Sequence, residues 1–389
     1  MSARHICFFS GKRGGFSHLL RLMEAVRDSG DMEHSLIVSD MHLSERFGRT
    51  IDEVRAALGS DERIYPVRTL VEGDTKAGRS KSIGLGLMGV TRVLERLAPD
   101  FMVVLGDRGE ILAPAIAAVE LNIPLVHLFG GDLTQGGVDE QVRHAVTKLA
   151  NIHFAATEES AERIRKMGEE PWRVHAVGSP VLDLVRQGRF TPAAEVRAKY
   201  GLGDEPVAIL LQHSVTWQVD EAREQIRATI QALTSAMDER GLQVVAVYPC
   251  SDPGWSVVVE ELERFAEKPG VQLHKNLPFQ DFWGLLDTAS VLVGNSSCGI
   301  LEAPSFGLPC VNVGMRQQDR TRGDNVIDVA HEAGAIRAGL DKALDDQEFL
   351  RTVALRRSPY GDGRAGERML KVLRETPLDD RLLFKKMTY

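Results

Sequence analysis

The sequence alternates short apolar runs with longer amphipathic segments, and this alternation occurs twice along the chain. Such a pattern is typical of βα units wound around a parallel sheet. A helix is expected between the first two apolar runs, because Leu19, Leu22 and Val26 recur with helical spacing. The other expected helices of the first series cover 82–98, 111–122 and 158–168, and its expected strands are Ile6–Phe9, Leu36–Ser39, Phe101–Leu105, Pro124–Phe129, His153–Ala156 and Val174–Val177.

The alternation pauses between residues 178 and 206, where the sequence is richer in Gly, Pro and charge, and there we place an interdomain linker. The sequence therefore predicts an N-terminal domain over 1–185, a C-terminal domain over 186–370, and a tail over 371–389 that packs back on the N-terminal domain. The second series predicts strands at Val207–Leu211, Val244–Tyr248, Val271–His274, Val291–Gly294 and Cys310–Val313, and helices at 219–239, 254–267, 280–288, 299–306 and within 341–377.

Two successive series predict an α/β protein with two Rossmann-like domains. Open parallel sheets bind ligands beyond the carboxyl ends of their strands. Two facing sheets would then enclose a deep cleft between the domains. We therefore expect the catalytic and ligand-binding residues to follow the ends of the strands.

Charge and composition exclude several classes of protein. A formal net charge of -8 argues against nucleic acid or an anionic membrane as the main partner. No uninterrupted apolar stretch is long enough to span a bilayer, and the N-terminus lacks a secretory apolar core. The four cysteines form no C-x-x-C pair, and no metal-ligand spacing is present, so we expect no disulfide framework, metal or cofactor. A cytoplasmic protein is expected.

Two motifs follow early strands. The segment Ser10–Leu20 carries three glycines at a strand-to-helix turn, and Arg13 could offer a planar fork to a diphosphate. A plain tight turn is the alternative. Asp107 directly follows the strand Phe101–Leu105 and would face the ligand edge, although an Asp here can also cap the next helix.

The segment His127–Leu149 is dense in acid–base groups around two Gly-Gly turns. Asp132 lies in the first turn, and Glu140, Arg143 and His144 lie on the helix that follows. Solvated loop charges are the alternative reading. An intrahelical pair between Asp139 and Arg143 is as plausible as a ligand role for Arg143.

In the second half, His213 lies just past the strand Val207–Leu211. After the strand ending at Gly294, the residues Asn295, Ser296, Ser297 and Gly299 open a helix, which suggests a phosphate cradle of N–H groups, hydroxyls and the helix dipole. Glu302 follows one turn later, where a carboxylate could accept the ribose hydroxyls. Two capping serines would explain part of this pattern, but not the arginines nearby at 316, 320 and 322.

These motifs together resemble the UDP-N-acetylglucosamine 2-epimerase superfamily, and within it the hydrolysing branch that serves sialic and legionaminic acid synthesis. The resemblance runs from about residue 5 to 375 and rests on six ordered blocks. They cover 39–54, 81–108, 127–159, 177–183, 276–282 and 294–314. It implies a GT-B type fold, with the nucleotide on the C-terminal domain, and a homodimer or homotetramer.

The resemblance also implies roles for individual residues. The catalytic groups would be Asp107, Asp132, Glu140 and His213, and the substrate-binding groups Arg13, Arg143, Asp252, Asn295, Ser296, Ser297, Gly299 and Glu302. The implied reaction eliminates the nucleoside diphosphate from UDP-N-acetylglucosamine or a modified analogue, and then adds water to release the free 2-epimer and UDP. A non-hydrolysing epimerase, a B-type glycosyltransferase and an inactive nucleotide-sugar binding protein are the alternatives.

Three positions depart from the family pattern. Gly15 stands where members commonly have an acid, Asp132 where they have Glu, and Cys250 in a YPCSD segment where they have Asn. All three belong to the sugar side of the implied site. We therefore expect a modified sugar, such as a 2,4-diacetamido-trideoxy derivative, or a nucleotide other than UDP.

Overall fold

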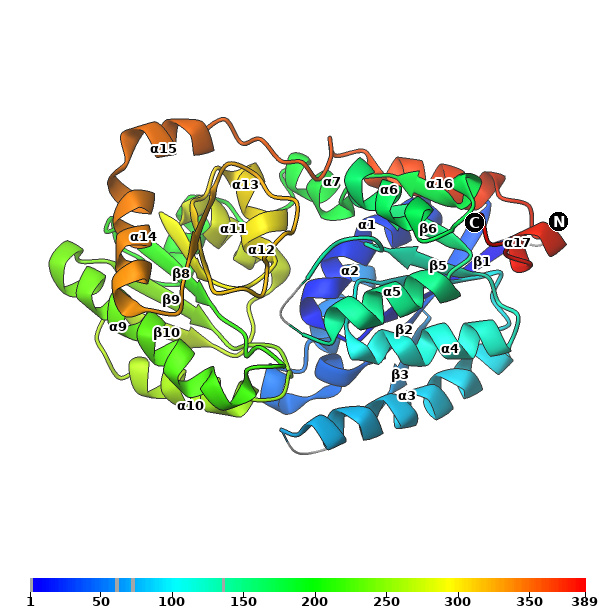
Figure 1. Ribbon diagram of the computed structural model, residues 1–389, viewed down its shortest axis with the longest axis horizontal. Coiled ribbons are helices and arrows are strands. Elements are labelled where there is room, and N and C mark those ends of the chain that lie inside the picture. Colours follow the sequence, from blue (N-terminus) through cyan, green and yellow to red (C-terminus); the bar gives the residue numbers. More distant parts are fainter. Residues whose placement is uncertain (1–2, 60–62, 71–73, 135–136) are drawn as a thin grey trace. The chain divides into compact units, whose positions relative to one another are not determined.

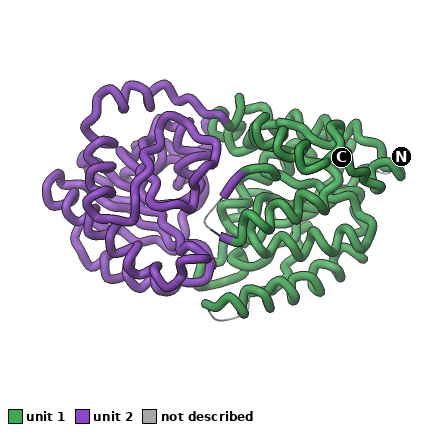
Figure 2. The backbone as a smooth tube through the Cα atoms, in the orientation of Figure 1, with its two compact units in different colours: residues 1–132, 138–186, 360–389 green, residues 133–137, 187–359 purple. Residues whose placement is uncertain are grey.

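The computed structural model describes residues 3–59, 63–70, 74–134 and 137–389. They form two compact units (Figure 2). Unit 1 contains residues 1–132, 138–186 and 360–389, and unit 2 contains 133–137 and 187–359. The main passage of the chain from unit 1 to unit 2 lies near residue 186, and the chain returns to unit 1 near 359. Residues 360–370, which the sequence places in the C-terminal domain, group with unit 1.

In the described part of unit 1, seven parallel strands form one sheet in the order β3-β2-β1-β4-β5-β6-β7. Helix α1 packs against α7 and α16, while α4 packs against α3 and α5, and the two groups cover opposite faces of the sheet (Figure 1). The strands are β1 (Arg4–Ser10), β2 (Met32–Ser39), β3 (Ile64–Val67), β4 (Phe101–Leu105), β5 (Leu125–Leu128), β6 (Ile152–Ala155) and β7 (Val174–Ala176). The helices are α1 (Arg13–Asp28), α2 (Ile51–Leu58), α3 (Lys76–Leu97), α4 (Leu112–Glu120), α5 (Asp139–Leu149), α6 (Glu158–Lys166), α7 (Pro180–Arg186), α16 (Ala365–Glu375) and α17 (Asp380–Leu383).

Unit 2 contains a parallel six-stranded sheet, in the order β10-β9-β8-β11-β12-β13. Helix α9 packs against α10 and α14 over one apolar core, while α8 packs against α11. The strands are β8 (Val207–Leu211), β9 (Gln243–Val247), β10 (Val271–His274), β11 (Val291–Gly294), β12 (Cys310–Val313) and β13 (Val326–Val329). The helices are α8 (Ala193–Lys199), α9 (Ala222–Arg240), α10 (Trp255–Phe265), α11 (Phe279–Thr288), α12 (Cys298–Leu301), α13 (Ala303–Phe306), α14 (Ala333–Asp345) and α15 (Gln347–Val353).

These two sheets confirm the predicted fold class of two Rossmann-like units. Two strands were missed, β3 and β13, which lie at sheet edges. The helix predicted over 299–306 is wrong as one element, because it is divided at Glu302 into α12 and α13. The expected linker contains two short helices, α7 and α8. Among the described residues, no helix is both long and apolar enough to cross a membrane.

The C-terminal tail packs on unit 1 through a buried ion network. The carboxylate of Glu169 accepts hydrogen bonds from Lys148 at 2.5 Å and contacts Lys385 at 2.7 Å and His153 at 3.2 Å. Burial opposes ionisation, but these three partners together lower the pKa of Glu169 to about 2. Arg173 further binds the backbone carbonyl of Leu382 at 2.8 Å. The tail is therefore tied to unit 1 by charge as well as by packing.

Candidate active site

Each sheet has one topological switch point, where the strand order reverses on either side of the first strand. In unit 1 this point lies between β1 and β4, and in unit 2 between β8 and β11. Ligands of doubly wound sheets bind beyond the carboxyl ends of the strands at this point. The predicted residues Arg13, Asp107, His213 and Asn295 all follow one of these four strands. The two halves of the candidate site are described separately, each within its own unit.

In unit 1, Arg143 joins two of the predicted acids. Its guanidinium on α5 is buried, donates to the Asp107 carboxylate, and donates to Glu140 at 3.1 Å. A third bond runs to the backbone carbonyl of Asp132 at 2.9 Å. Removing a buried cation from such a cluster leaves its carboxylates uncompensated. These contacts therefore support a positioning role for Arg143 rather than the substrate-binding role predicted from sequence.

The remaining acids of α5 have partners of their own. Glu140 accepts from His144 at 3.0 Å, so this pair extends the Arg143 cluster towards the partly exposed surface. Asp139 contacts Arg108 at 3.3 Å and Arg79 at 3.6 Å. Glu140, rather than Asp139, is thus the α5 acid that shares the Arg143 cation with Asp107.

Asp132 is buried and held from two directions. Its side-chain Oδ1 accepts a hydrogen bond from Ser160 at 2.6 Å, and its backbone carbonyl accepts from Arg143. The preceding residues are conformationally special. Phe129 is a bulky residue with φ of 61°, and Gly131 has φ of 76°. A Cβ at Gly131 would lie 2.2 Å from the carbonyl oxygen of Ser160, so only glycine fits. The second Gly-Gly turn includes Gly136, which lies outside the described residues.

His127 has a structural environment. It is fully buried, its Nε2 donates to the carbonyl of Gly106 at 2.7 Å, and its Nδ1 accepts from the Thr147 hydroxyl at 3.2 Å. Burial lowers the pKa of His127 to about 3. This neutral ring ties β5 to the loop that carries Asp107.

The turn after β1 brings further groups to the same edge. Arg13 begins α1 and is half-buried. Before it, the buried Lys12 contacts Asp40 at 3.6 Å and Glu110 at 4.0 Å. A Cβ at Gly15 would lie 3.3 Å from the Leu105 side chain at the end of β4. Gly15 therefore lies beside the strand that leads to Asp107, as the sugar-side interpretation requires.

In unit 2, His213 is fixed by backbone hydrogen bonds. The Asn295 side chain accepts from the His213 backbone N–H at 2.7 Å and donates to its carbonyl at 2.9 Å. The backbone N–H of Cys250 donates to Nδ1 of His213 at 3.0 Å. Since Nδ1 accepts, the neutral ring carries its proton on Nε2 and can act as a donor there. The Asn295 amide thus positions His213, which differs from the substrate contact predicted for it.

The segment after Asn295 is more compact than the predicted cradle. Helix α12 has only four residues, so its dipole is small. Ser296 accepts weakly from the Cys298 N–H at 3.5 Å, and Ser297 is half-buried. A Cβ at Gly299 would lie 2.3 Å from Sγ of Cys310, so Gly299 faces the sheet and not the ligand edge. The two serine hydroxyls remain as candidate phosphate contacts.

Glu302 lies between α12 and α13 and is buried. Burial raises the pKa of its carboxyl group to about 7, although the charge of Arg320 and the indole N–H of Trp283 act in the opposite direction. Hydroxyl groups that donate hydrogen bonds stabilise the ionised form of a buried carboxylate. The ribose hydroxyls predicted for Glu302 are donors of this kind.

The three arginines after β12 have different partners. Arg316 donates to the backbone carbonyl of Asn295 at 3.0 Å and so belongs to the His213 loop. Arg322 pairs with Asp328 at 2.6 Å and is engaged at the β13 edge. The buried Arg320 lies near Glu302 and contacts Gln317 at 3.2 Å.

Asp252, also predicted as a substrate-binding residue, is buried. Its backbone carbonyl accepts from the N–H of Trp255 at 2.9 Å, at the start of α10.

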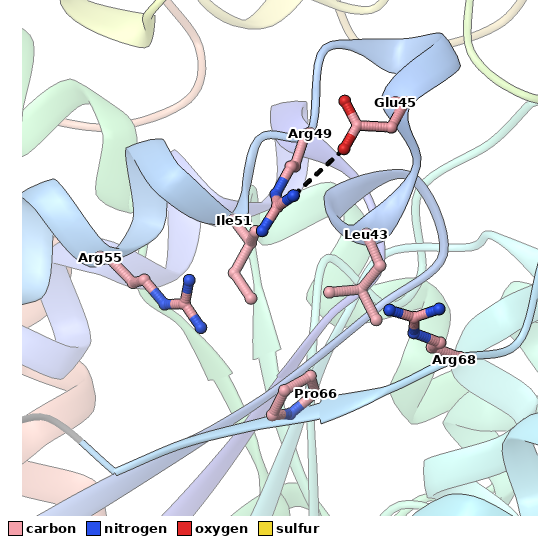
Figure 3. Close-up of a pocket in the computed structure, with 7 residues that line it drawn as sticks. All are labelled: Leu43, Glu45, Arg49, Ile51, Arg55, Pro66 and Arg68. Atoms are coloured by element: carbon pink, nitrogen blue, oxygen red, sulfur yellow. Dashed lines mark hydrogen bonds and ion pairs between the residues drawn. The ribbon is translucent and has the colours of Figure 1, made fainter.

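A separate pocket of about 590 Å³ is lined by residues of α2, of β3 and of the segment between β2 and α2 (Figure 3). It contains none of the predicted site residues. Arg49 pairs with Glu45 at 3.1 Å across its rim. Its lining residues are Leu43, Glu45, Arg49, Ile51, Arg55, Pro66 and Arg68. Among the residues that the structure describes, no group of three or more His, Cys, Asp or Glu side chains is placed to hold a metal ion.

The chain matches a family model described as UDP-N-acetylglucosamine 2-epimerase over residues 24–374. It is similar to a UDP-N,N'-diacetylbacillosamine 2-epimerase (hydrolyzing) from Legionella pneumophila subsp. pneumophila, with 38% identity over 387 residues. That match covers 99% of this chain and 100% of the relative. A GDP/UDP-N,N'-diacetylbacillosamine 2-epimerase (hydrolyzing) from Campylobacter jejuni is 30% identical, over 90% of this chain and 89% of the relative.

The fold also matches that of a solved UDP-GlcNAc 2-epimerase from Neisseria meningitidis bound to UDP-GlcNAc. The TM-score is 0.80 and the identity 18%, with 96% of this chain and 100% of that chain covered. The likeness extends over both doubly wound units.

Proposed function

This chain belongs to the UDP-N-acetylglucosamine 2-epimerase family, and on that premise we propose that it is a hydrolysing 2-epimerase of a UDP-linked 2,4-diacetamido-trideoxy sugar. One observation carries the proposal. The Legionella relative with this activity in its name matches along the whole of both chains, at 38% identity. Such a match includes both candidate half-sites.

In this proposal unit 2 binds the nucleotide. The Ser296 and Ser297 hydroxyls and the Nε2–H of His213 would donate to the diphosphate, and the Glu302 carboxylate would accept from the ribose. Arg13, at the start of α1, is proposed as a guanidinium donor to a phosphate of the substrate. Asn295 and Cys250 support the set through the contacts that fix His213.

Unit 1 would carry out proton transfer on the sugar. A carboxylate takes the hydrogen from carbon 2, the electron pair forms a double bond to carbon 1, and the bond from carbon 1 to the diphosphate oxygen breaks. Donors on the departing phosphate stabilise the charge that develops there. The products of this step are UDP and a glycal. Asp107, Asp132 and Glu140 are proposed as the acid–base group, with no assignment of the first proton to one of them.

The second step adds water. The water oxygen bonds to carbon 1, its proton passes to a carboxylate, and a second acid protonates carbon 2 on the face opposite to the one first deprotonated. Two acid–base groups are therefore needed around one ring. The Arg143 cluster joins Asp107 to Glu140, and Asp132 is the third acid on the same sheet edge.

The choice of sugar rests on the sequence departures and on the relatives. Gly15 and Asp132 both provide shorter side chains than the family pattern, which leaves room for an added acetamido group at carbon 4. Both relatives above carry diacetylbacillosamine in their names. UDP-N-acetylglucosamine is the second candidate, because a relative from Neisseria meningitidis serogroup B, 30% identical over 346 residues, is named for it.

The test is incubation with UDP-2,4-diacetamido-trideoxyglucose and with UDP-N-acetylglucosamine, each in deuterated water, followed by NMR of the products. We expect a free 2-epimer with deuterium at carbon 2, and a higher kcat/KM for the diacetamido substrate. A nucleotide-linked product would indicate a non-hydrolysing epimerase. Binding without any exchange at carbon 2 would indicate an inactive binding protein.

The biological setting forms a further part of the proposal. A released 2-epimeric diacetamido sugar is a suitable precursor for nonulosonate synthesis of the sialic acid type. All four cysteines are free thiols, which supports a reducing, cytoplasmic compartment. We propose a homodimer or homotetramer, which light scattering coupled to size-exclusion chromatography would distinguish from a monomer.

A further inference from the structure

The first turn of α6 lies against Asp132, although no motif of the sequence connects the two. Strands β5 and β6 are parallel neighbours, so the segments that follow them emerge at the same edge of the sheet (Figure 1). Asp132 follows β5, and Ser160 lies in the first turn of the helix after β6. Their side chains meet at 2.6 Å, and both are buried.

The hydroxyl groups at this contact form a directed chain. The Thr157 side chain caps α6 by accepting from the Ser160 N–H at 3.1 Å, and its hydroxyl donates to Oγ of Ser160 at 3.0 Å. Ser160 has one hydroxyl proton, and it donates that proton to Oδ1 of Asp132. Each donor in the chain is therefore used once, and the last acceptor is a carboxylate oxygen.

The backbone on both sides of this contact is rigid. Arg163, one turn later on α6, donates to the carbonyl of Gly131. Gly131 itself packs directly on the carbonyl of Ser160, where no Cβ would fit. With Arg143 on its backbone carbonyl, Asp132 is held at both its main chain and its side chain. The Ser160 bond acts on the carboxylate itself, whereas the bond from Arg143 acts on the main chain.

We propose that Ser160 is a positioning residue for the epimerisation reaction, because its hydroxyl holds Oδ1 of the Asp132 carboxylate and so fixes the direction of that carboxylate. This inference rests on the proposed function, in which Asp132 is one of the acid–base groups. Aspartate is one methylene shorter than the glutamate of the family pattern, so a fixed direction decides whether the carboxylate can reach carbon 2. Ser160 itself does not contact the substrate.

A double-mutant cycle tests the proposal, with kcat and KM measured for wild type, Ser160→Ala, Asp132→Asn and the double variant. We expect Ser160→Ala to lower kcat roughly 10- to 100-fold and to leave KM within about threefold. In the Asp132→Asn background, loss of the Ser160 hydroxyl is expected to change kcat by less than about twofold, because the two residues act as one unit. Equal losses in both backgrounds would overturn the proposal, as would wild-type kcat in Ser160→Ala.

Two further variants separate positioning from folding. Ser35→Ala also removes a buried hydroxyl from unit 1, where it contacts His5 at 2.9 Å, and is expected to keep wild-type kcat. Ser160→Cys keeps the shape of serine with a weak donor, and it replaces Ser160→Ala if that variant does not fold. Its kcat is expected to lie close to that of Ser160→Ala.

Failure of the proposed function would be visible first in the wild type, as the absence of released sugar. In that event crystal structures of wild type and Ser160→Ala still decide the inference. A rotated Asp132 carboxylate in the variant supports it, and an unchanged carboxylate overturns it.

Discussion

The two candidate half-sites are built from different interactions. In unit 1, charged side chains hold one another, with Arg143 between Asp107 and Glu140 and with Asp139 between Arg79 and Arg108. In unit 2, the contacts run between side chains and the main chain. His213 is fixed by Cys250 and Asn295, and Asn295 is held in turn through its own carbonyl by Arg316 and Gln317.

This difference corresponds to the two tasks of a nucleotide-sugar 2-epimerase. Proton transfer needs carboxylates that are ionised yet partly shielded, and a shared buried cation provides both conditions. Recognition of a nucleotide needs donors in fixed directions, which backbone contacts provide without added charge. Glu302 is the exception in unit 2, because it is a buried carboxyl group whose pKa is raised by burial although the cation of Arg320 lies near it.

The largest expected effect separates the two half-sites. Asp107→Asn keeps the size of the side chain but removes its charge, and we expect kcat to fall at least about 1000-fold. The dissociation constant for UDP should stay within about threefold, because UDP lacks the sugar. Steady-state kinetics and calorimetric titration with UDP measure the two quantities. The control is Asp31→Asn, an exposed unit 1 carboxylate paired with Arg374, which should retain full activity. A large loss of UDP binding in Asp107→Asn would place the nucleotide on unit 1.

The converse change weakens the nucleotide half. Glu302→Gln removes the proposed ribose acceptor, and we expect the dissociation constant for UDP to rise roughly 10- to 100-fold. At saturating substrate kcat should stay within about tenfold of wild type, so the loss appears mainly in KM. The same titration and kinetics measure it, with Asp341→Asn on α14 as the matched control. Unchanged UDP affinity would mean that Glu302 has only a structural role.

The sequence could predict those parts of the fold and of the candidate site that depend on residues close together along the chain. Asp107, His213 and Asn295 could be placed from the sequence because each directly follows an apolar strand, and strand ends gather at one edge of a parallel sheet; their roles stay predictions. The edge strands β3 and β13 were missed because they need not be apolar. Only Val67 of β3 is buried, and none of β13 is.

The contacts within the candidate site that the sequence could not predict join residues that are far apart along the chain. The role of Arg143 depends on Asp107, which lies 36 residues earlier, and Asn295 uses its amide on His213, 82 residues earlier. The close packing of Gly299 on Cys310 of β12 likewise joins residues that are apart in sequence. Ser160, in the first turn of α6, was not among the predicted site residues. The available signal was the pairing of β5 with β6, because the segments that follow two neighbouring parallel strands lie at the same edge of the sheet.

The pH dependence of nucleotide binding tests whether the Glu302 carboxylate accepts the ribose hydroxyls. If the ionised carboxylate accepts the ribose hydroxyls, affinity should fall as pH drops through the raised pKa of about 7, by roughly tenfold between pH 8 and pH 6. UDP-N-acetylglucosamine is the suitable ligand, because its diphosphate does not titrate in this range, and the Asp107→Asn protein prevents turnover. In Glu302→Gln added to that protein, the dependence should disappear. A flat profile in the parent protein would contradict the assignment.

The raised pKa of Glu302 also predicts how the free energy of unfolding depends on pH, and this dependence runs in the opposite direction to that of nucleotide affinity. Because burial raises the pKa of Glu302 from 4.5 to about 7, the folded state binds its proton more tightly than the unfolded state. Its contribution to the free energy of unfolding is therefore complete below about pH 4.5 and is lost as pH rises through about 7. Urea unfolding of wild type and Glu302→Gln across this range measures the difference, which should grow towards low pH in favour of wild type.

The smallest expected effect concerns the identity of the sugar, and it tests whether the unit 1 network is specialised as well as catalytic. Asp132→Glu restores the family's longer acid, and the added methylene must extend either towards Ser160 or into the space proposed for the 4-acetamido group. Since the α6 side is closed by packing against Gly131, we expect extension into the sugar space. The ratio of kcat/KM for the diacetamido substrate over UDP-N-acetylglucosamine should then fall about fivefold. Competition between the two substrates in one NMR sample measures this ratio directly. Equal losses on both substrates would instead mean that Asp132 sets the rate and that selectivity arises elsewhere, with Gly15→Asp as the next variant to compare.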